Sequence, residues 1–231
     1  YTQIGNYGVN PEDIESSSGP KVEGFIVKEH FDFYSNWRST MSLSEYLKEN
    51  KIVGIEGIDT RALTRHLRNN GVQMGIISVV DLNPLSLLDK IKGHPGISAI
   101  DLVEKVTCKE IYTWKEGCWA NPFQSKKPDE CADTFTSIDP PYSKISQRPR
   151  VVVYDFGVKF NILRNLYTAG FDIIVVPAKT PPEEVLEIDP AGILLSNGPG
   201  DPQTVTYAIE NTKRLIGKKP IFGICLGHQI L

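Results

Sequence analysis

The sequence predicts an α/β protein with two domains, an N-terminal α+β domain (residues 1–148) and a parallel β-sheet domain (residues 149–231). Three observations support this. From about Val151 onward, short β-branched runs alternate with helical segments, as in a parallel sheet covered on both faces. Before that point, strand-like and helix-like segments follow in no regular order. Between them, residues 131–149 are rich in Pro, Ser and Thr, which is typical of an exposed linker.

In the first domain, the hydrophobic pattern alternates as expected for strands or recurs every three to four residues as expected for helices. The expected elements are strands at 22–29 and 74–80 and helices at 43–49, 59–68 and 84–92. An Asp or Thr cap begins the helix at 59–68, which ends before Gly71.

In the second domain, apolar strands alternate regularly with helices. The expected strands are 151–156, 172–176, 192–196 and 220–224, and the expected helices are 161–169, 181–186 and 204–216. Ligands of parallel sheets bind beyond the carboxyl ends of the strands. The two Gly-rich loops, after Leu195 and after Ile224, are expected at that edge.

The most informative motif is Gly223-Ile224-Cys225-Leu226-Gly227, which follows the last expected strand. Gly-x-Cys-x-Gly is the pattern of a nucleophile elbow with cysteine in place of serine. Small residues on either side let the returning helix pass close to the strand. The neighbouring helix N-terminus favours the thiolate, so we expect Cys225 to attack a carbonyl carbon.

Such an attack needs hydrogen-bond donors for the developing oxyanion. At an elbow, the first donor is the backbone N–H after the nucleophile, here Leu226. The loop 196–202 (Ser-Asn-Gly-Pro-Gly-Asp-Pro) is a candidate for the second donor, because its glycines let a backbone N–H approach a ligand. The alternative is that this loop is only a tight turn. Gln229, one helical turn after Cys225, is either a substrate contact or a solvated helix residue.

The thiol also needs a general base. His30, His66 and His94 belong to the other expected domain, and His228 falls in the first helical turn after the elbow. A catalytic imidazole normally approaches from a later loop. We therefore expect the base to lie beyond Leu231, and we expect this stretch of chain alone to show no catalytic turnover.

Composition limits the classes of partner. A net charge of −3 and the absence of any long apolar stretch give no support for a nucleic-acid or membrane partner. The four cysteines form no Cys-x-x-Cys pair, which favours a reducing compartment, cytoplasmic or organellar. Arg61, Arg65 and Arg68 form a basic stripe at helical spacing that is either a solvated face or a partner-binding face.

The two Gly-rich motifs resemble those of class I glutamine amidotransferases: 223–229 is similar to their nucleophile motif and 196–202 to their oxyanion loop. Further segments, spread over nearly the whole chain, resemble the carbamoyl-phosphate synthase small-chain family. They are Ile4-Gly5-Asn6-Tyr7-Gly8, 57–64 (Gly-Ile-Asp-Thr-Arg-Ala-Leu-Thr), Gly75-Ile76-Ile77 and 154–159 (Tyr-Asp-Phe-Gly-Val-Lys). For the second domain this resemblance implies a flavodoxin-like sheet, of which residues 149–231 form an incomplete part.

The resemblance also implies an activity. Cys225 attacks the side-chain amide of glutamine, and water later hydrolyses the glutamyl thioester. Gly198 and Leu226 serve the oxyanion and substrate, and Gly200 and Gln229 hold the glutamine. Ammonia passes to a large synthetase subunit, in a heterodimer or larger assembly, that makes carbamoyl phosphate for arginine and pyrimidine synthesis. No cofactor is expected in this chain, and ATP and Mg²⁺ are expected on the large subunit.

Two departures from the family pattern are expected to matter. The His and Glu of a His-Pro-Glu type motif have no counterpart here, and neither does a Ser that precedes Ile4 in the family. The chain is therefore expected to be truncated at both ends. Three alternatives remain: an amidotransferase subunit for another acceptor, a non-catalytic partner or scaffold subunit, and a cysteine peptidase that shares the elbow.

Overall fold

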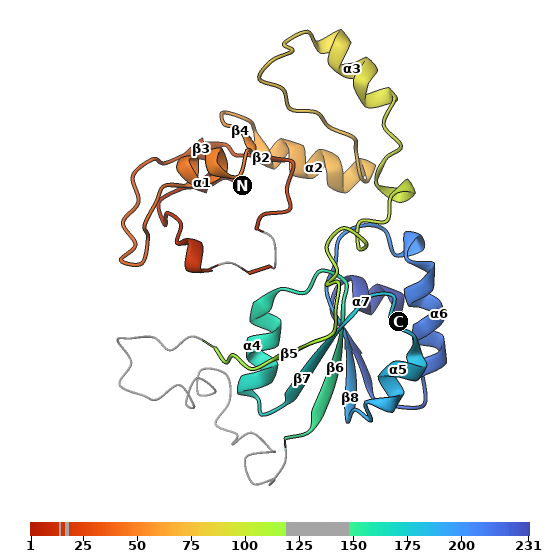
Figure 1. Ribbon diagram of the computed structural model, residues 1–231. Helices are drawn as coiled ribbons and strands as arrows, with labels where there is room; N and C mark the ends of the chain where they lie inside the picture. The colour runs from red at the N-terminus through yellow and green to blue at the C-terminus, as the bar shows by residue number, and fades with distance from the viewer. Residues whose placement is uncertain (14, 17–18, 119–147) are drawn as a thin grey trace. The chain divides into compact units, whose positions relative to one another are not determined.

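The computed structural model describes residues 1–13, 15–16, 19–118 and 148–231 (Figure 1). The chain divides into two compact units, residues 1–96 and 97–231. Within the described residues, no helix has both the length and the apolar character that crossing a membrane requires.

The first unit combines short parallel strand pairs with helices, so the expected α+β character is confirmed. Strand β1 (Gln3–Ile4) pairs with β3 (Glu29–His30), and β2 (Gly24–Ile26) pairs with β4 (Val53–Ile55). The helices are α1 (Leu43–Glu49), α2 (Thr60–Asn70) and α3 (Pro84–Lys92), preceded by a 3₁₀ turn at Pro11–Asp13.

All three helices expected in this unit are confirmed. The residues that cap them lie next to them in the sequence, which is why the sequence predicts them. Ser42 and Glu45 form a capping box at the start of α1. The Asp59 carboxylate accepts a hydrogen bond from Ala62 N at 2.9 Å, so Asp59 is the cap of α2. Helix α2 ends where Gly71 adopts a positive φ of 77°.

The strand expected at 74–80 is wrong. This segment has no regular structure, and the strand that pairs with β2 is β4. The segment does approach β2, since a Cβ on Gly24 would lie 2.7 Å from Cδ1 of Ile77. It packs there through a side chain and lacks a backbone ladder, which is what a strand requires. Val79 and Val80 are exposed. The strand expected at 22–29 is confirmed only in part, as β2 and β3.

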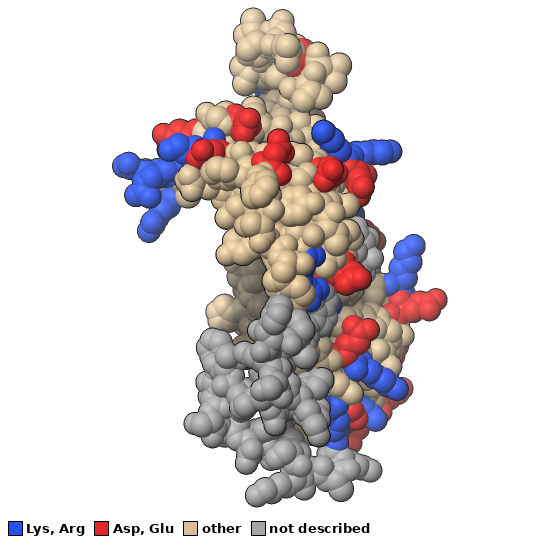
Figure 2. Space-filling view, turned by 90° about the vertical axis from the view of Figure 1, so that its left-hand side faces the viewer, with Lys and Arg blue, Asp and Glu red and all other residues tan. Residues whose placement is uncertain are grey.

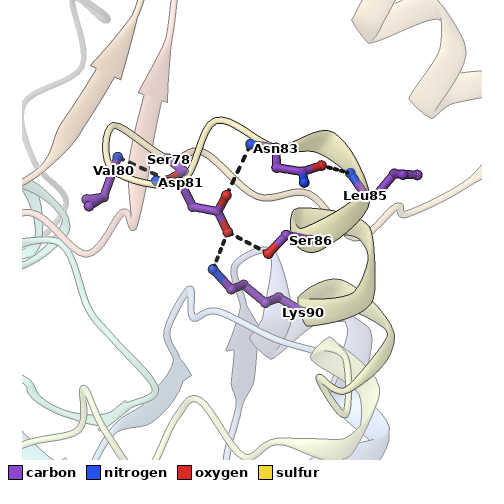
Figure 3. A network of polar contacts seen from close by, with 7 residues as sticks. All are labelled: Ser78, Val80, Asp81, Asn83, Leu85, Ser86 and Lys90. Carbon is purple, nitrogen blue, oxygen red and sulfur yellow. Dashed lines mark hydrogen bonds and ion pairs between the residues drawn. The ribbon is translucent and has the colours of Figure 1, made fainter.

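A polar network joins the loop before α3 to the helix (Figure 3). The Asp81 carboxylate accepts hydrogen bonds from Lys90 Nζ (2.6 Å), Ser86 Oγ (2.7 Å) and Asn83 N (3.1 Å). These contacts, led by that from Lys90, lower the pKa of Asp81 from 3.8 to about 2. Because the folded pKa is depressed, the stabilisation is complete above about pH 4 and is lost as the pH falls towards 2.

Asp81→Asn is expected to loosen the start of α3. The amide accepts fewer of these hydrogen bonds and carries no charge for Lys90, so amides of residues 81–88 should exchange hydrogen faster at pH 7. Asp89→Asn is the matched control, because among the described residues Asp89 pairs with Lys92 alone and both side chains are 75% exposed. Equal protection in the two variants would show that the network does not anchor the helix.

The second unit is built on a five-stranded sheet with the order β5-β7-β6-β8-β9. The strands are β5 (Tyr112–Trp114), β6 (Arg150–Asp155), β7 (Asp172–Pro177), β8 (Gly192–Leu195) and β9 (Ile221–Gly223). The last four are parallel, confirming the strands expected from the sequence. Their spatial order, second-first-third-fourth along the chain, is that of the flavodoxin-like fold.

Helices cover both faces of this sheet (Figure 1). They are α4 (Phe160–Thr168), α5 (Pro182–Glu187), α6 (Thr206–Leu215) and α7 (Leu226–Ile230). Val153, Ile173 and Val175 point towards α4 and form one buried cluster with its Leu163. Alternate strand residues, such as Val152 and Leu195, belong to a second cluster that includes residues of α5, α6 and α7. From β6 the chain adds β7 on one side and then β8 on the other, so the order of the parallel strands reverses between β6 and β8. A ligand site is expected at the carboxyl ends of the strands at this point.

Residues 97–114 belong to this second unit. The sequence did not reveal that they do. Strand β5 pairs antiparallel with β7, Tyr112 lying opposite Val175, and so occupies an edge of the parallel sheet. The compact units therefore divide between Gly96 and Ile97. The family-domain boundary near Arg148 stays a prediction, and nearly all of the linker expected at 131–149 lies outside the described residues.

Candidate active site

The elbow has the geometry that its sequence predicts. Cys225 lies between β9 and α7 with φ 52° and ψ −108°, a left-handed conformation that a residue with a side chain rarely adopts. The flanking glycines are required by close approach. A Cβ on Gly223 would lie 2.5 Å from the carbonyl oxygen of Gly227, and one on Gly227 would lie 2.2 Å from that of Leu195. The strand and helix thus meet with no space for side chains.

Backbone hydrogen bonds hold the elbow against β8. Ile224 N donates to Leu195 O at 3.0 Å, and Gly227 N donates to Ser196 O at 3.1 Å. The Leu226 side chain is buried in the core between the sheet and α7. The conformation at Cys225 is therefore fixed from both sides, as a strained residue requires.

The loop after β8 lies beside the elbow. A Cβ on Gly198 would meet Phe156 O at 2.3 Å and Leu226 Cδ2 at 2.8 Å, so Gly198 touches both the loop after β6 and the residue after the nucleophile. Gly200 has a φ of 93°. The structure thus brings together Gly198, Leu226 and Cys225, three of the residues expected at the site.

Side chains of the loop after β8 bind backbone groups of the loop after β6 and lock this arrangement. Ser196 Oγ accepts from Phe156 N (2.9 Å) and donates to Asn197 O (2.8 Å). Asn197 Nδ2 donates to Gly157 O at 2.9 Å, and its Oδ1 accepts from Lys159 N at 3.3 Å. Sequence reasoning assigned no role to these supporting groups. Their backbone partners, Phe156, Gly157 and Lys159, lie in the 154–159 motif, which the sequence analysis used only for the family resemblance.

Gln229 and His228 are less constrained. Both side chains are exposed, and neither makes a side-chain hydrogen bond to another described residue. Gln229 N donates to Cys225 O at 3.0 Å, which places Gln229 one turn along α7 from the nucleophile. The role of Gln229 in holding substrate stays a prediction.

The three described cysteines are all free thiols and differ in environment. Cys225 is exposed at the elbow, whereas Cys108 is half-buried. Burial, with a contribution from the negative charge of Asp155, raises the pKa of Cys108 from 9.0 to about 12. Cys108 is therefore a protonated and unreactive thiol at neutral pH.

Brief treatment with iodoacetamide at pH 7.5 is expected to modify Cys225 and to leave Cys108 unmodified. A pKa of about 12 reduces the thiolate fraction of Cys108 roughly a thousandfold relative to an ordinary thiol. Peptide mass spectrometry over a time course measures both rates in one sample. Equal rates at the two residues would contradict the environments described here.

The surface carries charges of both signs. On the face shown in Figure 2, Lys and Arg side chains stand beside Asp and Glu side chains. Arg61, Arg65 and Arg68 are exposed along α2, as the helical spacing predicts.

Two family models match the chain. Residues 1–77 match the carbamoyl-phosphate synthase small chain, CPSase domain, and residues 152–231 match the class-I glutamine amidotransferases. The second match includes the elbow and both loops that surround it.

Curated relatives match over the whole chain. A carbamoyl phosphate synthase small chain of Syntrophotalea carbinolica is 54% identical over 233 residues, covering 100% of this chain and 57% of the relative. Small chains of Aquifex aeolicus (49% identical) and Vibrio cholerae (47% identical) match 100% of this chain, which covers 58% of each relative. The chain thus spans less than two thirds of the length of these relatives. From these matches, the chain belongs to the carbamoyl-phosphate synthase small-chain family and carries a class I glutamine amidotransferase domain.

Proposed function

We propose that this chain supplies the glutamine-hydrolysing half of a carbamoyl-phosphate synthase. The observation that carries the proposal is the strained, exposed Cys225 at an elbow in contact with the Gly198 loop. The family membership supports glutamine as the substrate, and it supports a large synthetase subunit as the partner.

The proposed reaction follows from these positions. The Cys225 thiolate attacks the carboxamide carbon of glutamine, and the carbonyl oxygen becomes an oxyanion stabilised by backbone N–H groups of Leu226 and the Gly198 loop. When the C–N bond breaks, the nitrogen takes up a proton and leaves as ammonia. Water then cleaves the thioester, releasing glutamate and the free thiol.

The roles of Gly200 and Gln229 belong to the same proposal. Gly200 lies in the loop that carries Gly198, and Gln229 lies one turn beyond the nucleophile, so glutamine bound between them would place its amide at Cys225. His228 is exposed in the first turn of α7 and has no orienting partner among the described residues, so the geometry gives it no support as the base.

The released ammonia is proposed to reach a large subunit that binds ATP, Mg²⁺ and bicarbonate and makes carbamoyl phosphate. The product would serve arginine and pyrimidine synthesis. A reducing compartment, the cytoplasm or an organelle, fits the free thiols of Cys108, Cys118 and Cys225.

The test compares nitrogen donors in the full-length protein paired with its synthetase subunit. Both glutamine and ammonium should support carbamoyl phosphate formation, with glutamate produced only in the first case. Synthesis from ammonium but not from glutamine would instead identify a non-catalytic partner subunit. Glutamine hydrolysis without any carbamoyl phosphate would identify an amidotransferase for another acceptor.

A further inference from the structure

The Asp155 side chain, at the carboxyl end of β6, is only 4% exposed and accepts hydrogen bonds from backbone groups on two segments. Its Oδ1 accepts from Gly157 N (2.9 Å) and Val158 N (2.8 Å). Its Oδ2 accepts from Cys108 N (2.7 Å), 47 residues earlier in the chain. A buried carboxylate with this set of donors is a junction between segments.

The first segment held by Asp155 supports the oxyanion loop. Gly157 has a φ of 118°, and its carbonyl oxygen accepts from Asn197 Nδ2. A Cβ on Gly157 would lie 3.2 Å from Pro199 Cδ and 3.6 Å from Gly198 Cα. The backbone that Asp155 fixes is therefore in contact with the loop that packs against Leu226, the residue after the nucleophile.

The second segment lies close to the same loop and to Gly157. In residues 102–108, the Leu102 side chain lies 3.6 Å from the position of a Cβ on Gly200, and Val106 Cγ2 lies 3.0 Å from that of a Cβ on Gly157. The segment ends at Cys108, whose backbone N–H donates to the Asp155 carboxylate.

Polar contacts at both ends fix this segment to the rest of the second unit. Tyr207 donates a hydrogen bond to Asp101 at 3.0 Å, Lys179 pairs with Glu104 at 2.6 Å, and Ala178 N donates to Thr107 Oγ1 at 2.9 Å.

We propose that Asp155 is a positioning residue for glutamine hydrolysis, which holds residues 156–158 and 102–108 against the 196–200 loop so that Gly198 stays beside the Cys225 elbow. This inference rests on the proposed function. It also gives residues 102–108, which precede the amidotransferase match, a role in shaping that domain's site. Asp155 itself does not touch the reacting atoms.

Asparagine discriminates between the two halves of the junction. In Asp155→Asn the amide oxygen still accepts from Gly157 and Val158, but the amide nitrogen faces the N–H of Cys108, donor against donor. A buried unsatisfied pair of donors is costly, so residues 102–108 should move away from the loop. A displacement of the order of 1 Å at a catalytic loop reduces kcat by up to about a hundredfold.

The experiment compares Asp155→Asn with Asp172→Asn in the full-length protein. Asp172 is exposed at the amino end of β7, the strand next to β6. The Asp155 variant should lower kcat for glutamine hydrolysis by about tenfold to a hundredfold, with a smaller change in KM. Iodoacetamide should still modify Cys225 at the wild-type rate, because the thiol itself is unaffected. The Asp172 variant should match the wild type in all three measurements.

Hydrogen exchange separates this inference from the proposed function. Amides of residues 196–200 should exchange faster in Asp155→Asn than in Asp172→Asn, whatever the activity of the wild type. Equal exchange or unchanged kcat would overturn the role of Asp155, whereas a wild type without turnover would overturn only the proposed function. If Asp155→Asn fails to fold, Leu102→Ala serves instead: it removes Cγ and Cδ1 of Leu102, which both lie 3.9 Å from the position of a Cβ on Gly200, and should also speed exchange at 196–200. Wild-type exchange there would overturn the proposal.

Discussion

Replacing Cys225 with alanine is expected to abolish glutamine-dependent ammonia release. The thioester is expected to form on the thiol at this position, so its removal should lower the rate by at least about a thousandfold. Synthesis from ammonium by the paired large subunit should persist, because the elbow is not needed when free ammonia is supplied. Cys118→Ala is the control, since Cys118 is half-buried and its backbone N–H donates to Thr168 Oγ1. Residual glutamine-dependent turnover at near wild-type rate would contradict the assignment of the nucleophile.

The same position stores backbone strain. A side chain at φ 52°, ψ −108° costs about 1–3 kcal/mol, which Cys225→Ala retains and Cys225→Gly releases. The glycine variant should therefore have the higher free energy of unfolding in urea, although both variants are inactive. A less stable glycine variant would mean that the elbow carries no such strain.

Gly198→Ala is expected to have the second-largest effect. Its Cβ would lie 2.3 Å from Phe156 O and 2.8 Å from Leu226 Cδ2, far inside van der Waals contact. Phe156 is held by β6 and by Ser196 Oγ, so the loop that carries Gly198 must move. Loss of its alignment should lower kcat/KM for glutamine by about a hundredfold.

Gly192→Ala is the matched control for this prediction. Gly192 begins β8, and a Cβ there would meet nothing closer than Pro220 O at 3.6 Å, an ordinary contact. The control should keep wild-type kcat/KM. Wild-type kinetics in Gly198→Ala as well would show that the loop does not shape the substrate site.

The second unit could be predicted from sequence in most of its elements because its signals are local. Buried parallel strands give short apolar runs, and the elbow is encoded within five residues, Gly223 to Gly227. Strand β5 was missed because an edge strand is defined by its partner, here β7, far along the chain. The segment 74–80 was assigned wrongly for the converse reason: its residues favour a strand, but the strand that pairs with β2 is β4.

The candidate site was predicted at the nucleophile and the oxyanion loop and missed at its support. Gly198 lies in the loop after β8 and Leu226 begins α7 just after β9, so the rule that sites form at the carboxyl edge was enough to bring them together. The contact of Asp155 with Cys108 joins residues 47 positions apart. No periodicity or spacing encodes a contact between a buried carboxylate and the backbone of a distant segment.

The most direct test of the central claim is to trap the covalent intermediate. The full-length protein is mixed with glutamine, quenched in acid within one turnover, and digested for peptide mass spectrometry. A glutamyl thioester on Cys225, absent from the Cys225→Ala variant, is the predicted result. Ammonia release at full rate with the glutamyl group on another residue, or with Cys225 unmodified at every quench time, would contradict the account.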